Sequence, residues 1–127
     1  MKFSRLSLLV VVVLAVGLAA CGSGGGAAQS GTGKTVNVEA TEFAFNPNAF
    51  SGTVGQKITF KVTNKGTVDH NFVVLNTDGS QELTKTVVKV GTTVSLDFTP
   101  TAAGDYQIDC NLPGHKEAGM QGKLTVK

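Results

Sequence analysis

The stretch Lys57–Asn64, KITFKVTN, decides the fold, because apolar and polar side chains alternate along it residue by residue. Such alternation is typical of a β-strand with one buried face and one solvated face, and it does not fit the period of a helix. The same pattern recurs in TVSLDFT (93–99) and KLTV (123–126). These three segments are therefore predicted to be half-buried strands.

Two further segments depart from simple alternation. HNFVVL (His70–Leu75) is apolar at every position from its third residue onward, which is typical of a central strand covered on both faces. Apolar side chains share one parity through 36–40, but Phe43 and Phe45 take the other parity. We therefore expect a bulge or a corner near residues 41–42.

Turn-forming residues separate these segments at intervals of roughly 8–12 residues. About seven or eight short strands with this spacing predict an all-β fold, an antiparallel β-sandwich with Greek-key connections. The six phenylalanines beyond residue 40 and Tyr106 are interpreted as core residues. The turns are NPN (46–48), VG (54–55), NKG (64–66), DGS (78–80), VG (90–91), PTAAG (100–104) and PG (113–114).

The chain begins with the features of an export signal. Lys2 and Arg5 precede an apolar run at 6–18 that is too short for a typical transmembrane helix, so residues 1–20 are interpreted as a signal peptide. The tetrapeptide LAAC (18–21) resembles the bacterial lipobox, which implies cleavage before Cys21 and attachment of lipid to that cysteine. An ordinary signal peptide that leaves Cys21 as a free thiol, or an uncleaved span, is the alternative.

Residues 21–34 are predicted to be a lipidated cysteine and a flexible tether, because GSGGGAAQSGTG (22–33) offers almost nothing to bury. Residues 35–127 then form one domain. We expect an exported protein, lipid-anchored to the cell membrane and facing the periplasm or the extracellular side. Removing Lys2 and Arg5 from the eleven basic residues leaves nine, equal to the nine acidic ones. The mature protein is therefore nearly neutral, without the clustered charge that nucleic acid binding requires.

The soft metal donors of the domain gather near its C-terminal end. Cys110, His115 and Met120 lie within CNLPGHKEAGM, and His70 begins the apolar strand. Alternation over 105–110 points the Cys110 thiol inward at the end of a strand, and short turns can carry the other two donors past the same point. His70 would close the site from a neighbouring strand. With Cys21 lipidated, Cys110 has no partner for a disulfide.

This donor set suits copper better than zinc. Two imidazoles and a thiolate in a trigonal arrangement, with a weak axial thioether, accept both Cu(I) and Cu(II). Structural zinc prefers four cysteine and histidine ligands, and catalytic zinc keeps one position for water. We therefore expect one copper ion per chain.

The domain resembles the cupredoxin family of type-1, or blue, copper proteins, which includes plastocyanin, azurin and the membrane-tethered auracyanins. The resemblance rests on the pair His70-Asn71 and on the spacing C-x4-H-x4-M from Cys110 to Met120. It implies a cupredoxin-like fold over residues 35–127.

The resemblance also implies a role for each matched residue. His70, Cys110 and His115 would be the equatorial copper ligands and Met120 the axial one. The Asn71 N–H would donate to the Cys110 thiolate and pin the ligand loop, and the Leu112 N–H would be a second donor to the same sulfur.

Four charged residues lie close to the candidate ligands in the sequence, and the alternation and turn patterns predict where their side chains lie. Alternation places Asp109 on the face opposite Cys110, where plastocyanin has a tyrosine used in a second electron path, so that path is not expected here. Asp69 precedes His70 and is interpreted as an exposed turn residue. Lys116 and Glu117 are expected on the solvated surface of the ligand loop.

Four protein ligands leave the copper no position for a substrate, so we expect no catalytic activity. The sequence instead favours a monomeric one-electron carrier that shuttles between larger redox partners. His115 would be its exposed edge, with Leu112, Pro113, Gly114 and Gly119 forming an apolar rim for brief docking.

Two other function classes compete with electron transfer. A copper-binding module for delivery or storage is the main alternative, although the chain has no Met-rich or His-rich cluster beyond the four donors. A Cys-His thiol enzyme or hydrolase would need a reactive thiolate with a base and an orienting group beside an open pocket. Cys110 is instead surrounded by further metal donors.

Overall fold

The computed structural model describes residues 33–127. The predicted signal peptide, Cys21 and almost all of the predicted tether lie outside these residues. No described residue belongs to a helix with the length and apolarity needed to span a membrane. The described strands are β1 (Lys34–Thr41), β2 (Ala44–Asn46), β3 (Ala49–Gly52), β4 (Ile58–Asn64), β5 (His70–Leu75), β6 (Glu82–Val88), β7 (Thr93–Phe98), β8 (Gly104–Asp109) and β9 (Gln121–Val126).

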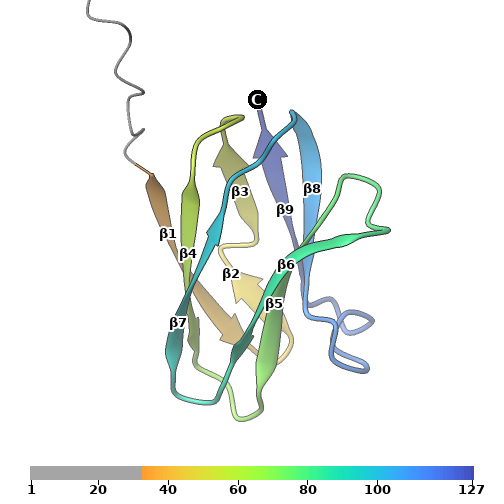
Figure 1. Ribbon diagram of the computed structural model, residues 1–127. Helices are drawn as coiled ribbons and strands as arrows, with labels where there is room; N and C mark the ends of the chain where they lie inside the picture. The colour runs from red at the N-terminus through yellow and green to blue at the C-terminus, as the bar shows by residue number, and fades with distance from the viewer. Residues whose placement is uncertain (1–32) are drawn as a thin grey trace, which may run out of the picture.

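The strands form two sheets that face each other, as Figure 1 shows. One sheet has the order β2-β1-β4-β7 and the other the order β3-β9-β8-β5-β6. The predicted all-β sandwich is confirmed. Its pairing is not wholly antiparallel, however, because β1 runs parallel to β4 and β3 runs parallel to β9. The short strands β2 and β3 lie between β1 and β4 in the chain and supply the crossover that this parallel pair needs.

A layer of aromatic rings joins the two sheets. Phe45 and Phe60 come from one sheet, Phe50 and Phe72 come from the other, and all four are buried. The ring centroids of Phe60 and Phe72 lie 5.1 Å apart, and Phe50 meets Phe60 edge to face at 5.4 Å. Burial of such side chains stabilises the fold by roughly 1.5–3 kcal/mol each. The same core continues to Cys110 and Met120, so the candidate site lies at one end of it.

The expected corner at residues 41–42 is a tight turn between antiparallel strands. β1 ends at Thr41, and Thr41 pairs with Ala44 at the start of β2. Phe45 is buried on β2, but the side chain of Phe43 is 40% exposed. The interpretation of every phenylalanine as a core residue is therefore wrong for Phe43, because the turn directs its ring past the end of the sandwich toward His115.

Asn64 fixes the turn that delivers His70 to the site. It ends β4, is 1% exposed, and its Nδ2 donates to the carbonyls of Val68 (2.8 Å) and Val88 (2.9 Å). Its Oδ1 accepts the Gly66 N–H at 2.9 Å. One buried amide thus joins the turn before β5 to the end of β6.

Replacing Asn64 by alanine should lower the free energy of unfolding of the metal-free protein by about 1–3 kcal/mol, because buried carbonyls lose their donor. Chemical denaturation measures this change. Asn37→Ala on the exposed face of β1 is the matched control and should change it by less than about 0.5 kcal/mol. Equal costs for the two variants would show that Asn64 does not hold this turn.

Candidate metal centre

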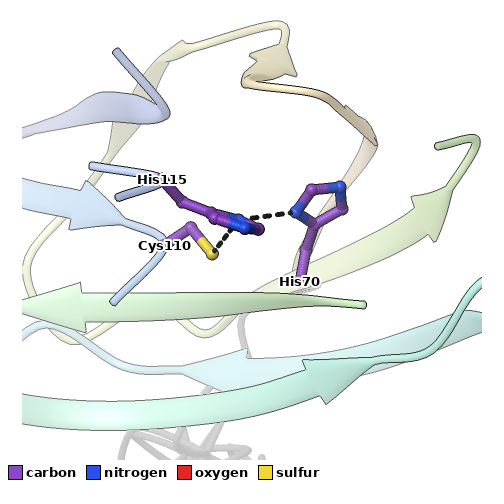
Figure 2. A group of neighbouring side chains, drawn as sticks. All are labelled: His70, Cys110 and His115. Carbon is purple, nitrogen blue, oxygen red and sulfur yellow. Dashed lines mark hydrogen bonds between the residues drawn. The ribbon is translucent and has the colours of Figure 1, made fainter. Parts of the chain in front are cut away.

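Three side chains converge at the end of the core. The side-chain donor atoms of His70, Cys110 and His115 all lie within 4.8 Å of one another. The Nδ1 atoms of the two histidines are 3.2 Å apart, and the Cys110 Sγ is 3.4 Å from the His115 Nδ1. Figure 2 shows both rings turning Nδ1 toward this common point. His70 and Cys110 are fully buried, whereas His115 is half-buried.

Strand pairing places the first two donors. His70 opens β5, and Cys110 directly follows β8. β5 and β8 are antiparallel neighbours in which Val73 pairs with Asp109, so the start of one strand lies beside the end of the other. The Asn71 N–H consequently donates to the Cys110 Sγ at 3.3 Å.

A compact loop presents the third donor. The His115 N–H donates to the Leu112 carbonyl at 3.1 Å, and the Gly119 N–H donates to the Lys116 carbonyl at 2.9 Å. Gly114 and Gly119 have φ values of 81° and 103°, which favour glycine. These turns fold residues 111–119 back over the end of β8.

Met120 closes this loop. Its N–H donates to the His115 carbonyl at 3.0 Å, and its carbonyl accepts the Cys110 N–H at 3.1 Å. The Met120 side chain is fully buried and belongs to the same core cluster as Cys110. The backbone of Met120 is therefore hydrogen-bonded to the backbones of both Cys110 and His115.

The two predicted donors to the thiol behave differently. Asn71 contacts Cys110 through its N–H and also binds the ligand loop, because its Nδ2 donates to the Asn111 Oδ1 at 2.7 Å. Within residues 33–127, no hydrogen bond joins the Leu112 N–H to the Cys110 sulfur. Leu112 instead packs against the core and uses its carbonyl to start the turn to His115.

Asp109, which alternation places on the face opposite Cys110, is buried. Its side chain is 5% exposed, and its Oδ2 forms an ion pair with the Lys116 Nζ at 2.7 Å. The ligand loop causes this burial by folding Lys116 back over the strand. The pair joins the residue before Cys110 to the residue after His115, so it braces both ends of the stretch between two donors.

The other two charged neighbours lie where they were expected. Glu117 is exposed on the ligand loop, and Asp69 is exposed before β5. The Asp69 Oδ1 accepts the Val90 N–H at 3.0 Å, so it ties this turn to the segment after β6.

Sequence reasoning missed two residues that contact the histidines. The Glu42 Oε1 lies 3.6 Å from the His70 Nε2, and the Phe43 ring meets His115 edge to face with centroids 4.8 Å apart. Both belong to the turn between β1 and β2. The parity change at residues 41–42 was the available signal, but it marks a corner without indicating what the corner contacts.

The surroundings of His70 and Glu42 shift the pKa of each side chain. Burial lowers the pKa of His70, and the neighbouring His115 lowers it further, although Glu42 opposes the shift. The ring is therefore neutral at pH 7, as a metal ligand must be. Hydrogen bonds from the Thr67 and Val68 N–H groups lower the pKa of Glu42, which keeps that carboxylate ionised.

The side chains present fit copper. Two imidazoles with facing Nδ1 atoms and one buried sulfur would provide the His₂Cys donors of a type-1 site, and the buried Met120 at the loop end would supply a soft thioether. A closed zinc site would require a fourth cysteine or histidine. In residues 33–127, the only group of three or more histidine, cysteine or acidic side chains suited to a metal is this one.

Comparison with known proteins agrees with this donor set. Auracyanin-A of Chloroflexus aurantiacus is 30% identical, with 94% of each chain covered. The copper-resistant cuproprotein CopI of Rubrivivax gelatinosus is 29% identical over 74% of this chain and 67% of the relative. The second relative is named a cuproprotein and neither relative bears the name of an enzyme, which agrees with the expectation that this protein is not an enzyme.

Solved structures show the same fold. Auracyanin B superposes with a TM-score of 0.67 and 26% identity, covering 74% of this chain and 88% of that structure. Auracyanin A, a "blue" copper protein of Chloroflexus aurantiacus, superposes with a TM-score of 0.65 and 25% identity, covering 73% and 98%. The family of cupredoxin-like domains matches residues 8–126. The chain therefore belongs to the cupredoxin-like domain family.

Proposed function

We propose that this protein is a membrane-tethered blue copper protein that carries single electrons between larger redox partners. The Nδ1 atoms of His70 and His115 and the Sγ of Cys110 would hold the copper, with the Met120 thioether as axial ligand. The convergence of the three donor atoms within 4.8 Å carries this proposal. Bound copper would supply a one-electron Cu(II)/Cu(I) couple.

The framework around the donors favours electron transfer over catalysis. His70 is fixed by strand β5, Cys110 by the end of β8, and His115 by a hydrogen-bonded loop. Rigid support of this kind limits the movement of ligands when the charge of the metal changes. Four protein ligands would also leave no position at which a substrate could bind.

The surface at this end of the sandwich suits brief docking. His115 is half-buried, and its neighbour Phe43 is 40% exposed. Val68 and Val90, which are 42% and 47% exposed, lie on the turn before β5 and on the segment bonded to Asp69. An apolar surface beside a half-exposed ligand would let an electron pass across a small, short-lived interface.

Export and lipidation complete the proposal. The apolar run at 6–18, the LAAC tetrapeptide and the glycine-rich residues 22–33 support a lipid anchor on Cys21 followed by a tether. A tether of this length has a root-mean-square reach of about 20 Å. The domain would then search for its partners near the membrane, on the periplasmic or extracellular side.

A role in copper resistance is the second candidate, because the 29% identical relative from Rubrivivax gelatinosus is named a copper-resistant cuproprotein. This candidate corresponds to copper delivery or storage. If this candidate is correct, a strain that lacks the gene should grow poorly at raised copper concentration, while its electron transport should be unchanged. If the protein is an electron carrier, the same strain should lose electron transport and keep its copper tolerance. Oxygen consumption or light-driven cytochrome oxidation measures the electron transport.

Adding Cu(II) to the metal-free protein should produce an intense visible band from the thiolate-to-copper transition. The band should disappear in Cys110→Ser, because the hydroxyl cannot replace the thiolate. Absorption spectroscopy with competing Zn²⁺ measures this result. A colourless protein that prefers zinc would exclude the proposed centre.

The axial position has its own test. Met120→Leu should keep the visible band but lose the weak thioether donor that favours Cu(II). The ratio of Cu(II) to Cu(I) affinity should fall about tenfold, which is a rise of about 59 mV in the reduction potential. An unchanged potential would remove Met120 from the ligand set.

Substituting Cys21 by serine should move the protein from the membrane fraction to the soluble exported fraction, because no lipid can be attached. Cell fractionation and mass spectrometry of the N-terminus measure this change, with Ser23→Ala as the matched control. Retention of Cys21→Ser in the membrane fraction would contradict the lipid anchor without affecting the copper centre.

A further inference from the structure

The outer nitrogen of His70 has an unusual position for a buried polar atom. His70 is 0% exposed, and its Nε2 has no hydrogen-bond partner among the described residues. Its Nδ1 faces His115 at 3.2 Å. A neutral imidazole carries one N–H, so a ring that offers the Nδ1 lone pair to a metal must carry its proton on Nε2.

The Glu42 carboxylate lies opposite this nitrogen. Its Oε1 is 3.6 Å from the His70 Nε2, which is longer than a hydrogen bond but close enough for a charge–dipole attraction that solvent weakens. The Glu42 side chain is 29% exposed. The residue as a whole is exposed, so solvent screens the charge of this carboxylate.

The turn before β5 holds this carboxylate in place. The Glu42 Oε1 accepts the N–H groups of Thr67 at 2.6 Å and Val68 at 3.0 Å. Gly66 leaves room for it, because a Cβ at that position would collide with the same carboxylate. The Thr67 and Val68 N–H groups, and the space left at Gly66, thus fix the Glu42 carboxylate opposite His70.

The turn between β1 and β2 places a different kind of side chain beside each histidine. Glu42 gives His70 an anionic neighbour, whereas the next residue, Phe43, gives His115 an aromatic edge at 4.8 Å between centroids. A negative charge on one side of the centre favours the more positive state of a metal bound there.

We propose that Glu42 is a positioning residue of the proposed copper centre, which this inference takes as given. Its carboxylate faces the Nε2–H of His70, holds the tautomer whose Nδ1 is free to bind the metal, and favours Cu(II) over Cu(I). Among residues 33–127, no other carboxylate lies within 4.0 Å of a ring nitrogen of either histidine.

Glu42→Gln tests the charge, because glutamine keeps the shape and an oxygen that can accept the Thr67 and Val68 N–H groups. The Cu(II)-to-Cu(I) affinity ratio should fall about tenfold, a rise of about 59 mV in the reduction potential, while the visible band remains. Glu39→Gln removes an exposed charge from the same segment and should change the ratio by less than about twofold. Equal potentials for wild type and Glu42→Gln would overturn the inference.

A second measurement needs no variant and no copper. Nitrogen-15 shifts of His70 in the metal-free protein should show the Nε2-protonated tautomer, and a dominant Nδ1–H form would overturn the inference. The two hypotheses also fail separately. A wild-type protein that forms no blue centre refutes the proposed function, whereas a blue Glu42→Gln protein with an unchanged potential refutes only the role of Glu42.

Discussion

The metal centre depends on the register between β5 and β8. Pairing of Val73 with Asp109 brings the start of one strand to the end of the other, so that the Asn71 N–H reaches the Cys110 sulfur at 3.3 Å. Because side chains alternate between the faces of a sheet, a slip of one residue would turn Cys110 away from the core. The pairing of β5 with β8 therefore also sets the distance between the donors.

The centre is built at some cost to the fold. His70 and Asp109 are buried polar residues, and each has one side-chain atom without a hydrogen bond, the His70 Nε2 and the Asp109 Oδ1. Unpaired buried groups of this kind typically cost about 1–3 kcal/mol each. His70 is itself a candidate ligand, and Asp109 directly precedes the candidate ligand Cys110. Buried polar groups that break the apolar pattern of the core are typical of functional sites.

The sequence predicted what depends on local pattern. Alternation identified β4, β7 and β9 and an apolar run identified β5, whereas β2, β3 and β6 were not singled out. The spacing of Cys110, His115 and Met120 indicated a loop that returns to its starting point. Parallel pairing was not predicted, because alternation carries no information on strand direction. The contact between Glu42 and Thr67 spans 25 residues, so neither segment alone could reveal it. Burial of Asp109 arises only when Lys116 folds over it, which a reading of alternation along β8 could not anticipate.

Copper-edge X-ray absorption of the frozen, copper-loaded protein tests most directly whether these side chains bind one metal atom. The account predicts a single short sulfur scatterer together with two imidazole nitrogens around each copper, and the loss of that sulfur in Cys110→Ser. A copper shell made only of nitrogen and oxygen in the wild-type protein would contradict it, because copper would then be bound elsewhere on the molecule.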